Sequence, residues 1–283
     1  FRDLKKQYQV LKKDIDSGIQ SVCASAHYIS GAEVAELEAQ LAAYVGAKHC
    51  ITCANGTDAL TLALKAWGIG MGDAVFVPDF TFFSSGECPA GEGATCVFVD
   101  VDAHTYNRSE VQSEGKYTPK VVVAVDLFGL PADYDAIKPI CEKYNLLLLE
   151  DGAQGFGGEL HGKKACSFGD IATTSFFPAK PLGCYGDGGA IFTNNDDWAA
   201  LIRSYAVHGK AGDDKYNNIR LGLNSRLDTL QAAILKVKFK AFKDYEVADI
   251  NKAAAFYNEE FKYAGLDKWL VLPEIPDGDV SSW

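Results

Sequence analysis

The sequence has no excess of positive charge. Its 283 residues include 27 lysines and arginines against 38 aspartates and glutamates, which gives a formal net charge of −11. A nucleic-acid-binding surface needs clustered positive charge to meet phosphates, so this balance argues against a nucleic-acid partner. A nucleotide-linked small molecule is still compatible with it, because a local pocket can be positive on an acidic protein.

Long hydrophobic runs are also absent. No stretch approaches the roughly 18 consecutive apolar residues of a membrane-spanning helix, so we expect no membrane partner. Residues 1–6 are charged and amphipathic and are unlike a secretory signal. The eight cysteines are scattered without the spacing of a disulfide framework. That scatter favours a reducing compartment and predicts a cytoplasmic protein.

A single C-x-x-C motif, Cys50 and Cys53, raises the question of a metal or redox site. The two cysteines flank Ile51 and Thr52 in a segment that is typical of a buried strand, and the sequence has no second such pair. We therefore interpret them as structural thiols and expect no bound metal.

After two amphipathic helices in the first 45 residues, short apolar runs alternate with helical stretches. The expected strands are 49–53, 74–77, 95–99, 121–125, 146–150 and 171–176, with helices at 57–67 and 134–144. Such alternation predicts an α/β fold, a three-layer α/β/α sandwich with a mostly parallel sheet. We expect residues 1–227 to form this large domain with its N-terminal helical arm. Residues 228–283 are expected to form an interdomain helix and an incomplete, smaller α+β domain.

Ligands bind at the carboxyl ends of the strands in a parallel α/β sheet, so the residues after each strand are the candidates for chemistry. The first expected strand is followed by Asn55-Gly56-Thr57-Asp58. A glycine at such a turn lets the backbone approach a ligand, and the following N–H groups form an anion site at a helix N-terminus. An ordinary helix cap made by Thr57 or Asp58 is the alternative.

Two further candidates are charged residues in apolar surroundings. Asp151, with Glu150, ends a very apolar strand, where a buried carboxylate needs a partner. A cationic ring nitrogen is one such partner, and a lysine or arginine is another. Lys180 lies in the apolar, glycine-rich segment 175–189. A desolvated lysine has a lowered pKa and can be a Schiff-base nucleophile, whereas a surface lysine with its amine in water is the alternative.

An anion-binding turn, a buried acid and an isolated lysine together match the needs of pyridoxal phosphate, whose phosphate, ring nitrogen and aldehyde each require one of them. The segments that carry these groups also show a family resemblance, at residues 53–60, 150–154, 175–189 and 224–233. On these segments the chain resembles the DegT/DnrJ/EryC1/StrS sugar aminotransferases, which are pyridoxal-phosphate enzymes of the aspartate-aminotransferase fold type.

The resemblance implies a role for each matching residue around the cofactor ring. Lys180 takes the place of the catalytic lysine that forms the Schiff base with pyridoxal 5′-phosphate. Asp151 takes the place of the carboxylate that keeps the pyridine nitrogen protonated. Gln154 resembles the residue near the ring hydroxyl, and Phe82 resembles the aromatic residue that stacks on the cofactor face.

The resemblance also implies a phosphate site. The backbone around Gly56 and Thr57, together with the Ser175 hydroxyl, takes the place of the phosphate-binding groups. Asn224 resembles the residue that reaches this phosphate across a dimer interface. The implied assembly is therefore a homodimer with shared active sites.

The implied reaction is transfer of an amino group from an amino acid, L-glutamate by family analogy, to a nucleotide-linked keto-sugar used in cell-surface polysaccharide such as lipopolysaccharide O-antigen. Segments 175–193 and 224–226 are similar to those of members that act on UDP-2-acetamido-2-deoxy-3-oxo-glucuronate. In these members the arginine at the position of Arg226 lies by the sugar carboxylate, which a guanidinium can clamp bidentately. Alternatively, Arg226 serves the dimer interface through Asp228 and the substrate is a neutral dTDP-3-keto-6-deoxy-sugar.

Other functions fit the sequence less well. Pyridoxal-phosphate sugar dehydratases of the same family place a histidine where this chain has Lys180. A non-transaminating relative that only binds the cofactor is a further alternative, against which Asp151, Gln154 and Lys180 argue together. A nicotinamide cofactor is disfavoured because no G-x-G-x-x-G motif opens a helix after the first strand.

Overall fold

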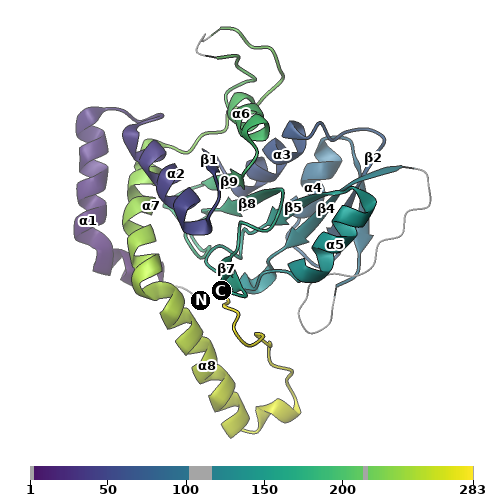
Figure 1. Cartoon of the computed structure of the whole chain (residues 1–283). Coiled ribbons are helices and arrows are strands. Elements are labelled where there is room, and N and C mark those ends of the chain that lie inside the picture. The colour runs from purple at the N-terminus through teal and green to yellow at the C-terminus, as the bar shows by residue number, and fades with distance from the viewer. Residues whose placement is uncertain (1–2, 102–116, 213–215, 283) are drawn as a thin grey trace.

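The structure, a computed structural model, describes residues 3–101, 117–212 and 216–282. It begins with the helical arm expected from the sequence, formed by α1 (Leu4–Ser25) and α2 (Ala32–Val45). Asp3 caps α1 by accepting a hydrogen bond from the backbone N–H of Lys6, and Gly46 ends α2 in the left-handed region at φ 78°. Figure 1 shows α1 lying against α7 (Thr229–Ala241), with which it packs.

The central sheet has seven strands in the order β1-β9-β8-β5-β4-β2-β3. Five neighbouring strands, from β8 to β3, are parallel, and β9 runs antiparallel to both of its neighbours. The prediction of a mostly parallel sheet is therefore confirmed. The strands are β1 (His49–Cys53), β2 (Asp73–Pro78), β3 (Thr95–Val99), β4 (Thr118–Val125), β5 (Leu147–Asp151), β8 (Ile171–Ser175) and β9 (Gly189–Thr193).

The sequence analysis does not predict β9. Its apolar run, from Ala190 to Phe192, has only three residues and follows a glycine-rich stretch, so it lacks the length that marks a strand. In the structure β9 returns directly beside β8 and fills the space between β8 and β1. Its position matters for the site, because it places Gly189 between Cys53 and Ser175.

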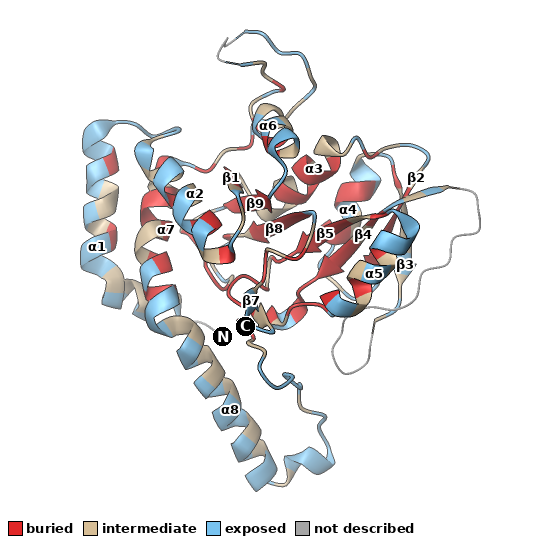
Figure 2. Cartoon of the chain, viewed as in Figure 1, coloured by how far each residue is buried: buried red, intermediate tan, exposed pale blue. Residues whose placement is uncertain are grey.

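Helices cover both faces of the sheet, as expected for three layers. One face is covered by α3 (Gly56–Ala66), α4 (Ser84–Gly91) and α6 (Asp196–Tyr205), and the other by α2, α5 (Tyr134–Tyr144) and α7. Neighbouring residues of β4, Val123 and Ala124, contribute to cores on opposite faces because strand side chains alternate. Figure 2 shows the middle strands of the sheet buried and the outer sides of the helices exposed, whereas the outer strand β3 has no buried residue.

Beyond the sheet, α7 continues through a π-helical turn, Phe242–Glu246, into α8 (Val247–Tyr263). Helix α8 has no buried residue and extends away from the sheet (Figure 1). The chain then returns, and Val280 pairs with Glu159 of the small hairpin formed by β6 (Glu159–Leu160) and β7 (Lys163–Lys164). The division into domains at residue 227 stays a prediction. Within the described ranges, no helix has both the length and the apolar character needed to cross a membrane.

Candidate active site

The strand register brings two of the candidate segments together at one edge of the sheet. Cys53, Gly189 and Ser175 lie opposite one another across β1, β9 and β8. The turn after β1 therefore lies beside the end of β8. A side chain at Gly56 would put its Cβ only 2.8 Å from the Cβ of Ser175. The close approach of these two segments requires glycine at position 56.

Helix α3 starts from this turn. Its N-cap is Asn55, whose side-chain oxygen accepts a hydrogen bond of 2.7 Å from the backbone N–H of Asp58. The cap is therefore made by Asn55, and not by Thr57 or Asp58. The Thr57 hydroxyl bonds instead with Ser84 Oγ at 2.8 Å. The first N–H groups of α3, with the Ser175 hydroxyl beside Gly56, make a cradle suited to an anion such as phosphate.

Asp151 ends β5 at the same edge and is buried. Its Oδ2 accepts a hydrogen bond of 2.9 Å from Ser85 Oγ, and its Oδ1 accepts one of 3.2 Å from the backbone N–H of Ala153. Burial raises the pKa of Asp151, while these two donors and the charge of Lys180 oppose the rise. Sequence reasoning missed the role of Ser85. The hydroxyl-rich run from Thr81 to Ser85, directly after β2, is the signal that could have found it.

Lys180 lies in the loop after β8 and is half-buried. Its backbone N–H donates to Phe177 O at 2.8 Å, which fixes the loop locally. Burial lowers the pKa of the Lys180 amine, and the negative charge of Asp151 partly opposes this. The amine lies 6.0 Å from the ring centroid of Phe82, whose side chain is 65% exposed. The structure thus brings Lys180, Asp151 and Phe82 to one place.

Gln154 lies three residues beyond Asp151, and its side chain is held by a neighbouring turn. Its Oε1 accepts a hydrogen bond of 2.8 Å from the backbone N–H of Phe128. Phe128 belongs to the short 3₁₀ turn Leu127–Gly129 after β4 and has a left-handed backbone, with φ 54°. Its half-exposed ring lies 6.3 Å from the ring of Phe80, which follows β2. The exposed aromatic rings therefore extend along the same edge as Phe82.

Glu150, next to Asp151, is not part of this edge. Its carboxylate accepts hydrogen bonds from the backbone N–H groups of Phe168 at 2.6 Å and Gly169 at 2.9 Å, and also from that of Cys166. The partners of the Glu150 carboxylate are thus backbone amides, and not the lysine or arginine side chain that the sequence analysis considered. Burial and the negative charge of Glu150 raise the pKa of buried Asp126 well above its usual range. Burial likewise raises the pKa of Glu150, and the backbone N–H groups of Gly169, Phe168 and Cys166 oppose that rise.

The segment 224–226 is anchored to the turn after β1. Ser225 is fully buried, and its hydroxyl accepts a hydrogen bond of 3.0 Å from the backbone N–H of Ala54. The side chain of Arg226 donates to Asn224 Oδ1 at 2.6 Å, and Asn224 is exposed. Within this chain the two predicted binding residues therefore bond to each other.

Arg226 also lines an open hollow of about 960 Å³. Three more of its lining residues are basic, namely His208, Lys210 and Arg220, and none of the described lining residues is acidic. On a chain with a net charge of −11, this is a local positive surface of the kind that an anionic ligand requires.

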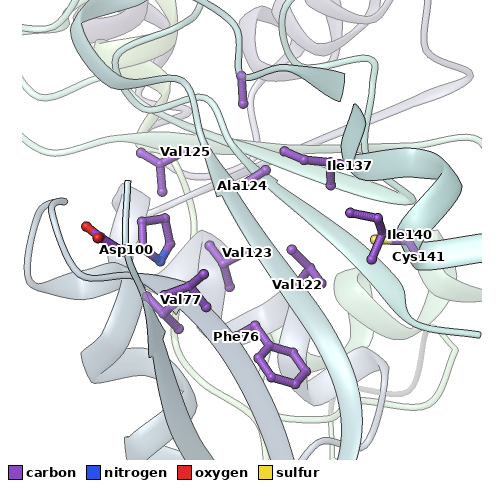
Figure 3. A pocket seen from close by; sticks show the side chains of 13 residues that line it. Phe76, Val77, Asp100, Val122, Val123, Ala124, Val125, Ile137, Ile140 and Cys141 are labelled. Atoms are coloured by element: carbon purple, nitrogen blue, oxygen red, sulfur yellow. The ribbon is translucent and has the colours of Figure 1, made fainter. Parts of the chain in front are cut away.

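A second hollow lies elsewhere and has a different character. It is a cavity of about 50 Å³. Figure 3 shows its lining side chains, which come mainly from β2, β4 and α5. Of the 13 residues that line it, Asp100 is charged and the others are apolar, among them Phe76, Val122 and Ile137. Such a lining suits neither a phosphate nor a charged ring, so we place the chemistry at the carboxyl edge.

Cys50 and Cys53 point to opposite faces of β1. Cys50 packs in the core beneath α2, whereas Cys53 packs in the core beneath α3. Three residues along a strand reverse the direction of the side chain, so the two thiols do not face one common site. Burial raises the pKa of both thiols.

Comparisons with known proteins find a family match over most of the chain. The model of the DegT/DnrJ/EryC1/StrS aminotransferase family matches residues 9–283. The UDP-2-acetamido-2-deoxy-3-oxo-D-glucuronate aminotransferase of Pseudomonas aeruginosa is 50% identical over 268 residues, which cover 94% of this chain and 74% of that protein. The dTDP-3-amino-3,6-dideoxy-alpha-D-galactopyranose transaminase of Aneurinibacillus thermoaerophilus is 40% identical over 288 residues, covering 100% and 77%.

A solved structure is similar over the whole chain. It is that of a DegT DnrJ EryC1 StrS aminotransferase from Brucella abortus, with a TM-score of 0.94 and 45% sequence identity. The match covers 100% of this chain and 76% of that one.

Proposed function

The chain belongs to the DegT/DnrJ/EryC1/StrS aminotransferase family, and on this premise we propose that it transfers the amino group of L-glutamate to UDP-2-acetamido-2-deoxy-3-oxo-glucuronate with pyridoxal 5′-phosphate as cofactor. The observation that carries the proposal is the position of Lys180 near buried Asp151 at the edge where the Gly56 turn lies. The 50% identity with the Pseudomonas aeruginosa enzyme supports the choice of sugar.

The residues at this edge fit the cofactor. The start of α3 at Gly56 and Thr57, with the Ser175 hydroxyl, suits its phosphate. Buried Asp151 suits its protonated ring nitrogen, and the exposed ring of Phe82 suits its flat face. When bound, pyridoxal phosphate supplies an aldehyde carbon that carries the amino group and a positively charged ring that accepts electrons.

Lys180 supplies the amine and the base for the reaction. Its lowered pKa increases the neutral fraction at a given pH, and only the neutral amine bonds to a carbonyl carbon or accepts a proton. In the proposed reaction, Lys180 Nζ removes the proton from the α-carbon of the amino donor and delivers a proton to the former keto carbon of the sugar. Asp151 keeps the ring nitrogen protonated, supported by Ser85.

The positive hollow beside Arg226 supports an anionic substrate. A nucleotide-linked uronic acid carries a diphosphate and a carboxylate, and His208, Lys210 and Arg220 line the same hollow as Arg226. A guanidinium is suited to a bidentate contact with the carboxylate. A neutral dTDP-linked keto-sugar is the second candidate, favoured by the 40% identity with the Aneurinibacillus thermoaerophilus enzyme and by the bond that joins Arg226 to Asn224.

We further propose a cytoplasmic homodimer that serves cell-surface polysaccharide synthesis, such as that of O-antigen. Eight free cysteines support a reducing compartment. In the dimer, exposed Asn224 of one subunit reaches the phosphate in the other. Mixing inactive Lys180→Ala and Asn224→Ala subunits then restores activity, because a mixed dimer regains one intact site. Sites built from one subunit alone would show no such recovery.

The decisive experiment combines cofactor, donor and acceptor. Purified protein is incubated with pyridoxal phosphate, L-glutamate and the UDP-linked keto-uronate, and both 2-oxoglutarate and the amino sugar are measured. Both products are expected in equal amounts. Bound yellow cofactor without 2-oxoglutarate would instead identify a non-transaminating relative, and acceptance of neutral dTDP-sugars alone would replace the substrate.

The residue assignment is tested with a matched pair of lysines. Lys180→Ala is expected to abolish the yellow colour and to lower turnover by more than about 1000-fold. Lys163 is the control, because burial also lowers its pKa although it lies over the ring of Phe168, away from this edge. Lys163→Ala should keep colour and turnover. Normal activity in Lys180→Ala would overturn the assignment.

A further inference from the structure

Residues 280–282, in the segment that returns after α8, contact the sheet body next to the candidate site. Val280 forms two backbone hydrogen bonds with Glu159, of 2.8 and 2.9 Å, and the backbone N–H of Ser282 donates to Gly129 O at 3.0 Å. Ser281 is 7% exposed and Ser282 is fully buried. Burying a hydroxyl group costs free energy unless it makes a hydrogen bond. The hydrogen-bond partners of Ser281 and Ser282 therefore show which residues these two serines position.

Both hydroxyls bond to the backbone of residues at the carboxyl edge. Ser282 Oγ donates to the carbonyl oxygen of Gln154 at 3.0 Å, and Ser281 Oγ donates to the carbonyl oxygen of Phe128 at 3.0 Å. The N–H of Phe128 donates in turn to Gln154 Oε1. Three hydrogen bonds and the peptide bond between Ser281 and Ser282 therefore close a ring that includes Gln154 and Phe128. We call this ring the serine clasp.

The backbone of Phe128 shows that this ring is under constraint. A bulky residue with φ 54° is a genuine outlier. Such a conformation persists only where the surroundings over-determine it, and it is concentrated at functional sites. Here the N–H and the carbonyl of Phe128 are both held, one by Gln154 and the other by Ser281.

The clasp also fixes which end of the Gln154 amide faces the site. Only the oxygen of a glutamine amide can accept a hydrogen bond from an N–H group. The hydrogen bond from Phe128 therefore occupies Oε1 of Gln154, and Nε2 is the end of the amide that can donate to the cofactor. A donor is what the anionic ring oxygen of pyridoxal phosphate requires, whereas a flipped amide would present an oxygen to it.

We propose that Ser282, assisted by Ser281, is a positioning residue that sets the orientation of Gln154 towards the cofactor. The inference rests on the proposed function, because it assumes that Gln154 faces the ring. It also links the site to α8, since Asn251 Nδ2 on that helix donates to Ser281 O at 2.8 Å. Through this contact, a movement of α8 would shift the two serines and with them the side chain of Gln154.

The test is a double-mutant cycle in the whole chain, read by cofactor affinity and by the pH at which the visible band of the bound cofactor changes. Ser282→Ala is expected to weaken binding of pyridoxal phosphate about three- to tenfold, the usual effect of one lost hydrogen bond, and to shift that pH. In a Gln154→Ala background the same substitution should have no further effect on either quantity.

A matched control removes a buried hydroxyl elsewhere. Thr193 lies at the amino edge of the sheet, opposite the first residues of β1 and β8. It is 3% exposed, and its hydroxyl donates to Asp170 O at 3.0 Å. Thr193→Val should leave the affinity and the band unchanged. If Ser282→Ala does not fold, Ser281→Ala in the same cycle measures the same coupling to Gln154.

The outcomes separate this inference from the proposed function. Equal effects of Ser282→Ala with and without Gln154 would overturn the clasp, because a merely structural serine acts independently of that side chain. A protein that binds the cofactor and transfers the amino group, but whose Ser282→Ala variant behaves like Thr193→Val, would overturn the clasp alone. Failure of the unsubstituted protein to bind the cofactor would instead overturn the proposed function.

Discussion

The hydroxyl of Ser85 lies 2.9 Å from Oδ2 of Asp151, and both residues are buried. Ser85 stands at the start of α4 next to Ser84, whose hydroxyl bonds with Thr57. Two successive serines of one helix therefore support the two ends of the proposed cofactor site, the acid behind the ring and the turn beneath the phosphate. Because both are fixed to α4, their separation is set by a rigid element.

Removing the Ser85 hydroxyl should raise the pKa of Asp151 further, since that donor is the largest influence opposing burial. With Ser85→Ala, less of Asp151 is ionised at a given pH, so the acidic limb of the activity profile moves to higher pH. We expect kcat/KM below neutral pH to fall about tenfold. Ser85→Thr keeps the hydroxyl and should retain the original limb; an unshifted limb in Ser85→Ala would contradict the role.

The amine of Lys180 should titrate below the ordinary value of 10.5 in protein free of cofactor, because burial lowers its pKa. Asp151→Asn removes the negative charge that partly opposes this, so the pKa should fall further. NMR of reductively methylated lysines measures both values, with Lys180→Ala identifying the signal. A Lys180 pKa that rises in Asp151→Asn would show that the two groups do not interact as described.

A methyl group at position 56 should disrupt the phosphate cradle. Its carbon would lie 2.8 Å from Ser175 Cβ, and such overpacking costs roughly 1–3 kcal/mol. Gly56→Ala should therefore lower the free energy of unfolding by that amount and weaken cofactor binding at least about tenfold. Adding Ser175→Gly removes the clash and should recover stability but not affinity, because the hydroxyl is lost. Unchanged affinity in Gly56→Ala would argue against phosphate binding at this turn.

Asp126 should make the protein less stable as the pH rises. Its pKa is higher in the folded than in the unfolded chain, so its contribution to stability is present below the unfolded value of 3.8 and is lost as the pH rises towards the folded value. The substitution Asp126→Asn introduces an amide that is neutral at every pH and can still accept hydrogen bonds from Ala132 and Tyr134.

Asp126→Asn should therefore flatten the dependence of stability on pH and raise the free energy of unfolding at alkaline pH, by about 1 kcal/mol. Urea unfolding at mildly acidic and mildly alkaline pH measures the difference. Asp14→Asn, at an exposed position, is the control and should change neither curve. A steeper dependence in Asp126→Asn would contradict a raised pKa of Asp126 in the folded chain.

Arg226 should discriminate between charged and neutral sugars. Arg226→Gln removes the proposed clamp, so kcat/KM for the keto-uronate should fall about 100-fold, in line with the strength of a bidentate charged contact. A neutral keto-sugar on the same nucleotide should lose little. Arg226→Lys keeps the positive charge but cannot make the bidentate contact. Its kcat/KM for the keto-uronate should therefore lie between those of the unsubstituted protein and Arg226→Gln. Equal losses for both sugars would favour the interface role through Asp228.

The sequence predicts the parallel part of the fold well because its strands are apolar runs between helices. The runs at 95–99 and 49–53 match β3 and β1 to the residue. The antiparallel strand β9 escapes prediction, since three apolar residues after glycines carry no periodicity. Yet β9 determines the geometry of the phosphate cradle. It lies between β1 and β8 and so sets the distance from the turn at Gly56 to Ser175.

Within the site, single motifs predict which residues lie at the edge, but not what supports them. Lys180 and Asp151 can be identified because charge in apolar surroundings is conspicuous. Ser85 and Ser282 are ordinary serines, and they contact Asp151 and Gln154 only through tertiary packing across 66 and 128 residues of chain. Contacts of that separation have no local signature in the sequence.

The serine clasp has a consequence for synthesis on the ribosome. The N-terminal part of a chain can begin to fold as it emerges from the ribosome. Gln154, however, lacks the bond from Ser282 until about 130 further residues have been translated, counted from the 128-residue separation. A nascent chain that already contains Lys180 and Asp151 therefore lacks the hydrogen bonds of the serine clasp until Ser281 and Ser282 have been translated.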